Sequence, residues 1–187
     1  MNLTGKFIIV LLLTGFINPL TSAASPPGKV DRPEYETEHF KLRLFPRTPN
    51  QMAAFYTGRG FPAFAIDEVR QVCFITILLK NKGKDIVWFD LKNWRFTTEA
   101  GELKRYLRSH WKQRWTELGL EKRFQSTFRW TLMPEQLDFR PYEGEGGNII
   151  LPRTDKPITI QASLAIGERR SKVYDITIKN VSCASDP

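Results

Sequence analysis

The chain has 187 residues, of which 41% are hydrophobic and 26% are charged. This is ordinary globular composition, and it excludes a disordered, collagen-like or low-complexity protein. Lysine and arginine outnumber aspartate and glutamate by 28 to 20, which gives a formal net charge of +8. A chain of this length buries enough apolar surface in one core to fold without a cofactor or a structural metal, so we expect neither.

Residues 1–23 have the pattern of a secretory signal peptide. The cation Lys6 precedes an apolar stretch from Phe7 to Ile17, and small residues follow up to Ala23 and Ala24. The unbroken apolar run is shorter than the ~20 residues that a membrane-spanning helix needs. We therefore expect an exported protein, periplasmic or extracellular, whose mature chain has no transmembrane anchor.

The two cysteines, Cys73 and Cys183, are expected to form a disulfide bond. Export would place them in an oxidising compartment, where a lone pair of cysteines usually closes. The two cysteines have no CxxC spacing and no neighbouring histidine, so the sequence does not indicate a redox or metal-binding role for them. The bond would tie the C-terminus to the core.

The first elements follow from local signals. Residues 24–38, which include Pro26, Pro27 and Gly28, predict a flexible N-terminal arm. Apolar residues alternate with cations from Phe40 to Leu44, which predicts a strand. Thr48, Pro49 and Gln51 have the spacing of a capping box, so a short helix is expected from there to about Gly58 or Gly60.

Two β-prone runs come next. Residues Val72–Lys80 and Ile86–Phe96 predict two strands, and Asn81–Asp85 between them predicts a hairpin loop. Leucine and tryptophan then recur every three or four residues over Glu102–Leu118, which predicts an amphipathic helix. Further strands are expected over Ser126–Leu132, Asn148–Leu151, Ile158–Ile166 and Lys172–Val181.

About seven strands with turn-rich linkers and two helical segments favour a mainly β fold. We predict an immunoglobulin-like antiparallel β-sandwich with a short N-terminal helix and one inserted amphipathic helix. It would form a single domain over residues 39–187.

The order of features after Cys73 supports this fold by resemblance. A strand ending in the sequence KNKG, a tryptophan-bearing strand, then Pro134, Glu135, Pro141 and Glu143 before GGNIILP resemble small exported immunoglobulin-like accessory domains of bacteria. That resemblance implies that the strand ending at Asn81 pairs with the strand after the proline and glutamate turn. The segments FYTGRGFP, LMPE and GGN also resemble short exported proteins of Gram-negative bacteria.

Enzymatic chemistry finds little support in the residue pattern. The chain has two histidines, His39 and His110, and no GxSxG motif, so a serine or cysteine nucleophile has no evident base. The same two histidines make no metal-ligand pattern, and we predict no metal site. One enzymatic alternative is an envelope enzyme that acts on glycan through two of the loop carboxylates Glu135, Asp138, Glu143 and Glu145, which would have to face a common cleft.

The most informative feature is a basic segment that carries two tryptophans. Seven cations and two carboxylates lie between Lys104 and Arg123, and Trp111 and Trp115 are one turn apart. The candidate binding surface combines this segment with FYTGRGFP, and its residues are Arg105, Arg108, Trp111, Lys112, Trp115, Phe55, Tyr56, Arg59 and Phe61. If both tryptophans are core residues, only the cations remain for binding.

These observations favour a non-enzymatic binding or accessory module of the bacterial envelope. Its partner would be a protein or an anionic surface polymer, and nucleic acid is not expected for an exported chain. A peripheral binder of anionic lipid is the other alternative.

Overall fold

The computed structural model describes residues 33–186, which belong to one compact unit that begins at Asp31. The predicted signal peptide and most of the predicted arm lie outside the described residues. The arm was predicted to extend to residue 38, but the structure places a short strand, β1 (Glu34–Glu36), inside that range. The strand pairs with residues 41–43, so the fold begins before His39.

The first sheet has four antiparallel strands in the order β1-β2-β3-β8. Strand β2 is Phe40–Arg47, β3 is Val72–Asn81 and β8 is Gly144–Pro152. The pairing of β3 with β8 runs from Val72 opposite Pro152 to Lys80 opposite Gly144. This is the pairing that the resemblance to exported accessory domains implies.

The second sheet is built around β9 (Ile158–Ile166), which pairs with β10 (Lys172–Val181) on one side. Its other side pairs with β4 (Val87–Asp90) and β5 (Arg95–Thr98). Strands β4 and β5 follow one another along β9 and are separated by η1 (Leu91–Asn93), a single turn of 3-10 helix. At the outer edge, β7 (Gln136–Phe139) pairs with β4, and β6 (Gly101–Glu102) pairs with β5.

The two sheets pack face to face as a β-sandwich, so the predicted mainly β class is confirmed. Side chains alternate between buried and partly exposed along β2 and β9, as expected of strands with one face in a core. The core holds aliphatic residues of β2, β3, β8, β9 and β10, with the aromatic rings of Phe89, Trp94 and Phe96.

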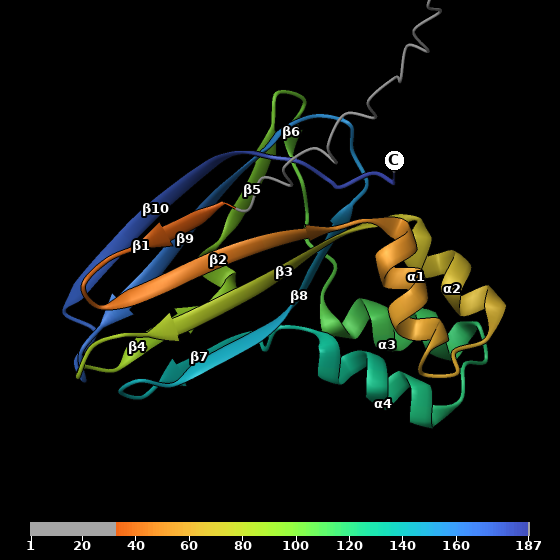
Figure 1. Cartoon of the computed structure of the whole chain (residues 1–187), viewed down its shortest axis with the longest axis horizontal. Coiled ribbons are helices and arrows are strands. Elements are labelled where there is room, and N and C mark those ends of the chain that lie inside the picture. The colour runs from red at the N-terminus through yellow and green to blue at the C-terminus, as the bar shows by residue number, and fades with distance from the viewer. Residues whose placement is uncertain (1–32, 187) are drawn as a thin grey trace, which may run out of the picture. The chain divides into compact units, whose positions relative to one another are not determined.

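Four helices gather beside one end of the first sheet (Figure 1). They are α1 (Pro49–Thr57), α2 (Ala63–Arg70), α3 (Arg108–Glu117) and α4 (Lys122–Thr131). Their apolar faces form a second core with Phe74 and Ile150, which point away from the sandwich interior. The single inserted helix of the sequence prediction is therefore a pair, α3 and α4, and α2 was also not predicted.

Helix α1 confirms its sequence signal. The Thr48 hydroxyl accepts a hydrogen bond from the Gln51 amide at 3.2 Å, and the Gln51 side chain accepts one from the Thr48 amide. This reciprocal capping box begins the helix with Pro49 as its first residue.

The predicted hairpin of residues 72–80 and 86–96 is wrong. Strand β3 belongs to the first sheet and β4 to the second, so residues 82–86 cross between the layers. Asn81 holds this crossing, because its amide nitrogen donates hydrogen bonds to the carbonyls of Asp85, Phe139 and Arg140.

Two predicted elements around the helical insertion are also wrong. The helix expected over Glu102–Leu118 begins only at Arg108, because the Leu103 amide bonds to Phe96 and the Tyr106 amide bonds to Ile150. These contacts hold residues 103–107 in extended form. The strand expected over Ser126–Leu132 is part of helix α4, whose Phe124 and Phe128 enter the second core together.

The disulfide between Cys73 and Cys183 is present, as predicted, with a Cα to Cα distance of 5.4 Å. Cys73 lies on β3 in the first sheet, and Cys183 follows the end of β10 in the second. The bond therefore joins the two layers and fixes the C-terminal segment, where the Asp186 carboxylate accepts hydrogen bonds from the Asn50 amide at the start of α1.

Candidate functional site

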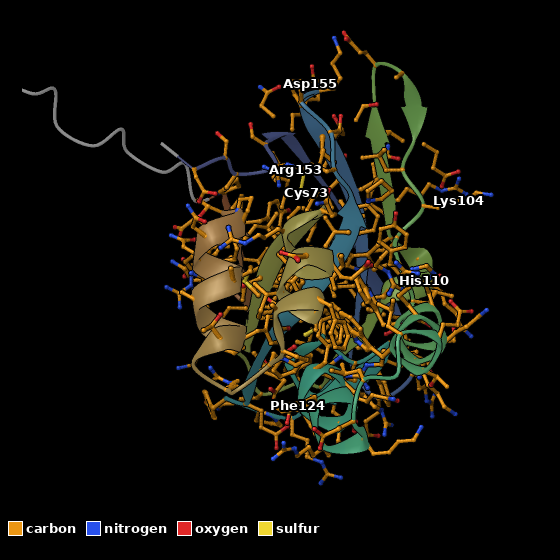
Figure 2. All side chains as sticks on the ribbon, turned by 90° about the vertical axis from the view of Figure 1, so that its right-hand side faces the viewer. Cys73, Lys104, His110, Phe124, Arg153 and Asp155 are labelled. Carbon is orange, nitrogen blue, oxygen red and sulfur yellow. A yellow bond between two sulfur atoms is a disulfide. The ribbon has the colours of Figure 1, made fainter. Side chains whose placement is uncertain are left out.

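The predicted binding aromatics lie mostly in the interior. Trp111 is 3% exposed and Trp115 is 1% exposed, and Tyr56 and Phe61 are also buried. Figure 2 views the helical end of the protein, where His110 of α3 and Phe124 of α4 are labelled. The expectation of exposed aromatic area on the Glu102–Leu118 segment and on FYTGRGFP is therefore wrong for these four residues.

Ring packing explains their burial. Phe128 of α4 lies between the two tryptophans of α3, with ring centroids at 4.9 Å from Trp111 and 5.0 Å from Trp115. On its other side Phe128 stacks on Tyr56 at 5.3 Å. Burial raises the pKa of the Tyr56 phenol, whose hydroxyl is hydrogen-bonded to Thr131 at 2.7 Å.

Phe55 and Arg59 of the same predicted surface remain nearer the solvent. The Arg59 guanidinium lies over the Phe55 ring at 3.5 Å and donates a hydrogen bond to the Phe55 carbonyl. These two residues contact each other at the C-terminal end of α1. The structure does not bring them together with Arg105, Arg108 or Lys112 in one cavity.

The cations of the basic segment divide into paired and unpaired groups. Arg105 forms a bidentate pair with Glu135, with contacts of 3.1 and 2.5 Å. Arg114 forms another with Glu68 of α2, with contacts of 2.9 and 2.5 Å, which raises the pKa of Arg114. These two arginines connect structural elements and are not free to hold a ligand.

The unpaired cations surround a groove between α3 and α4. We call this cavity, of about 520 Å³, the basic groove. Its cations are Arg108 and Lys112 from α3 and Lys122 and Arg129 from α4, and its floor is formed by Trp111, Trp115, Phe128 and Leu132. Arg129 was not predicted as a site residue, because it lay in the segment expected to be a strand.

The helix hairpin itself creates this arrangement. Gly119 adopts a φ of 70° just after α3, and the Leu120 amide bonds back to the Trp115 carbonyl at 2.9 Å. Glycine tolerates this left-handed conformation, so the chain reverses within four residues. The reversal sets α4 beside α3 with their basic residues along one groove.

The groove has donors and positive charge but no carboxylate among its lining residues. None of its four cations forms an ion pair with another residue in the range 33–186. Ser109, Gln125 and Ser126 supply further polar groups. Such a lining is suited to a bound anion.

Arg108 is the most constrained of these cations. Burial lowers the pKa of its guanidinium, the nearby charge of Arg129 lowers this pKa further, and the charge of Glu135 raises it in part. One of its terminal nitrogens donates to the Leu132 carbonyl at 2.6 Å, while its buried Nε has no hydrogen-bond partner among the described residues. An anion between Arg108 and Arg129 would relieve their repulsion and accept hydrogen bonds from their guanidinium groups.

The acidic residues of the glycan-enzyme alternative separate into two places. Glu135 is held by Arg105, whereas Asp138, Glu143 and Glu145 border a depression of about 460 Å³ at the edge strand β7. All three are exposed, and the Glu143 carboxylate accepts a hydrogen bond from the Arg140 amide at 2.8 Å. Three of the four carboxylates thus border one depression, which is the arrangement that the glycan-enzyme alternative requires, although all three are open to solvent.

Residues 33–186 contain no group of three or more potential metal-binding side chains. No helix within that range is long and apolar enough to cross a bilayer. His110 stacks on Tyr106 with ring centroids at 4.6 Å.

Comparison with known proteins gives no family. No family model and no curated protein matches the chain. Among solved structures, the yjhA protein of Bacillus subtilis is 7% identical with a TM-score of 0.38, and the match covers 70% of this chain and 76% of that one. The ycdA protein of Bacillus subtilis strain 168, provisionally described as a lipoprotein, is 10% identical with a TM-score of 0.41, covering 79% of this chain and 38% of that one.

Proposed function

We propose that this protein is an exported, non-enzymatic binding module of the bacterial envelope that recognises an anionic component through the basic groove. The observation that carries the proposal is the groove's lining: four cations without a carboxylate partner in the described chain, gathered from two helices over a floor of aromatic rings. Positive charge left unpaired in this way favours an acidic ligand over a neutral one.

Export is supported by the cysteine pair. The disulfide joins the two layers of the fold, and structural disulfides persist in oxidising compartments. The signal-peptide pattern of residues 1–23 agrees with this placement in the periplasm or outside the cell.

The immunoglobulin-like assignment belongs to the same proposal and is supported by strand order. When β4 and β5 are taken as one strand and the short edge strands β1 and β6 are set aside, β2, β3 and β8 form one layer, and β10, β9, β4 with β5, and β7 form the other. Immunoglobulin-like sandwiches divide seven antiparallel strands between two layers in this manner. Both helix pairs are then insertions between strands.

Binding of short polyphosphate chains tests the groove directly. We expect the oxidised protein to bind polyphosphate, with a change in tryptophan fluorescence, and not to bind neutral dextran. The Lys122→Gln/Arg129→Gln variant removes one pair of charges from the groove, and its affinity should fall about ten-fold or more. Added salt should weaken the remaining binding.

The matched control is Arg123→Gln with Lys179→Gln, since Lys179 is exposed on β10. Arg123 lies on α4 beside the groove residues but pairs with Glu121, and neither control residue lines the basic groove. This variant loses the same net charge and should bind within about two-fold of the parent protein. Equal losses in the two variants, or no binding of polyphosphate by the parent protein, would overturn the proposal.

A second candidate, peripheral binding to anionic lipid, is favoured by one residue. Trp130, at the end of α4 next to Arg129, is 81% exposed. An exposed tryptophan beside cations is typical of segments that lie at a lipid surface. Binding to vesicles of anionic lipid separates this candidate from the first, because only the lipid candidate requires Trp130.

A further inference from the structure

A second cavity adjoins the basic groove at the start of α3. It measures about 540 Å³ and lies between η1 and the extended residues 103–107. We call it the apolar cavity after Leu91, Trp94, Phe96, Leu103 and Leu107, which line it. Arg108 and Ser109 line both cavities, so a ligand that contacts these two residues reaches both.

The side chains of the apolar cavity come from three segments of the chain. Leu91, Trp94 and Phe96 are buried residues at the interrupted strand of the second sheet, and Leu103 and Leu107 precede α3. Lys92, Glu102, Lys104 and the Arg105–Glu135 pair also line it. The volume is within the range of small-molecule sites, and the five apolar side chains offer contact to an aliphatic group, while the other lining residues are charged or polar.

Leu107 is unusual for its place in the fold. It occupies the N-cap position of α3, where a side chain with an oxygen usually accepts a hydrogen bond from the first turn. Leucine provides no such bond, and its side chain is 47% exposed instead of being buried in either core. The residue therefore offers apolar contact at the mouth of the cavity, and it leaves the first helical amides near Arg108 without a side-chain cap.

Trp94 supplies an independent observation. It is 5% exposed and lines the apolar cavity, yet its indole Nε1 has no hydrogen-bond partner among the described residues. The indole Nε1 atoms of Trp111 and Trp115, which line the basic groove, are also buried without a partner among the described residues. A buried N–H group without a partner costs free energy, so both cavities have polar groups in their walls that the described residues leave unsatisfied.

We infer that the ligand of the basic groove is an anionic amphiphile. Its phosphate or carboxylate head lies at Arg108 and Arg129, and a single aliphatic chain extends past Leu107 into the apolar cavity. This inference rests on the proposed function, because it assigns the head to the same groove. It adds the ligand class, which the basic groove alone does not determine.

A series of alkyl phosphates tests the inference, with inorganic phosphate as the headgroup alone and butyl, hexyl and octyl phosphate as monomeric amphiphiles. Binding to the oxidised protein is measured by calorimetry below the concentration at which the probes aggregate. Each methylene group that becomes buried should raise affinity by up to about four-fold, so affinity should increase with chain length. Octyl glucoside, which has a chain but no anionic head, should bind much more weakly than octyl phosphate.

Two variants test where the alkyl chain and the anionic head of the ligand lie. Leu107→Gln should reduce the dependence of affinity on chain length without changing the affinity for short polyphosphate. Val173→Gln is the matched control, since Val173 is 56% exposed on β10 and lines neither cavity, and it should leave the whole series unchanged. Arg129→Gln should lower the affinity of every alkyl phosphate by a similar factor.

The possible failures are distinguishable. Binding of polyphosphate in the groove with no dependence on alkyl chain length would overturn the amphiphile inference and leave the proposed function intact. Binding to vesicles of anionic lipid that requires Trp130, with no binding of monomeric alkyl phosphates, would also overturn it and would favour the peripheral lipid candidate. A chain-length effect that is the same in Leu107→Gln would show that the chain lies elsewhere.

Discussion

Asn81 is the clearest case of a single side chain that determines a connection in the fold. It is fully buried at the end of β3, its amide nitrogen donates to three carbonyls, and its amide oxygen accepts a hydrogen bond from Gly83 at 2.9 Å. Asp85 belongs to the layer crossing, Phe139 is the last residue of β7, and Arg140 follows it. One polar side chain thereby links the crossing to the end of β7 and satisfies their backbone carbonyls.

Replacing Asn81 should destabilise the protein strongly. Asn81→Ala leaves these backbone groups without their partner, and we expect the free energy of unfolding to fall by about 2–4 kcal/mol. Urea denaturation of the oxidised protein measures the change. Lys80→Ala, at the exposed neighbouring position, is the control and should change stability by less than about 0.5 kcal/mol. A loss of that small size in Asn81→Ala would contradict the role assigned to the amide.

At the residue scale the sequence shows where cations accumulate but not which of them stay unpaired. The excess lies between Lys104 and Arg123, and Arg129 of the basic groove falls outside it. Nothing in the sequence showed that Arg105 pairs with Glu135 and Arg114 with Glu68, because those carboxylates are 30 and 46 positions away. Only the folded structure shows that Arg105 and Arg114 are paired, and therefore which cations remain unpaired around the groove.

Among the elements, the edge strand β1 is linked to its neighbours by ion pairs as well as by strand pairing. Lys41 contacts both Glu34 and Glu36 from the neighbouring strand, and Lys82 reaches Glu36 from the crossing loop. The hydrogen bond from Lys41, followed by that from Lys82, lowers the pKa of Glu36 from 4.5 to about 2. These exposed pairs hold the edge strand on the sheet at neutral pH.

This pKa gives stability a defined dependence on pH. The pKa of Glu36 is lower in the folded protein, so its contribution is complete above the unfolded value of 4.5 and is lost as the pH falls toward about 2. Glu36→Gln should therefore lower the melting temperature at neutral pH and have little effect near pH 2. Thermal unfolding across this range measures the difference, with the exposed Glu168→Gln as control. Parallel curves for parent and Glu36→Gln would show that the pair contributes nothing.

Helix starts explain which elements the sequence could predict. Helix α1 has a capping box and was predicted, whereas the N-cap residues of α2, α3 and α4, which are Pro62, Leu107 and Glu121, make no side-chain cap. Their starts carry no local signal, and packing of their apolar faces determines them instead. Strands β9 and β10 were predicted with their observed bounds, because alternation between a buried and an exposed face is visible in the sequence itself.

At the scale of the whole molecule, the disulfide sets how far the unfolded chain can expand. It closes a loop with a sequence separation of 110 residues, which corresponds to about 4–5 kcal/mol in the chain-entropy account. The Cys73→Ala/Cys183→Ala variant should lose stability of this order in guanidinium denaturation. The reduced parent protein is the control, since it should unfold at nearly the same midpoint as the variant. A difference below about 1 kcal/mol between oxidised protein and variant would contradict the entropic account.

The covalent link between β3 and the segment after β10 also determines how the protein carries mechanical load. Tension applied between residue 33 and residue 186 passes along the chain to Cys73, crosses the sulfur atoms to Cys183, and continues to the end. The backbone from residue 74 to residue 182 is bypassed, and that stretch contains α3, α4 and the whole basic groove. Strands β1 and β2 with helices α1 and α2 would be pulled away first, while the chain that forms the groove stays outside the path of the force.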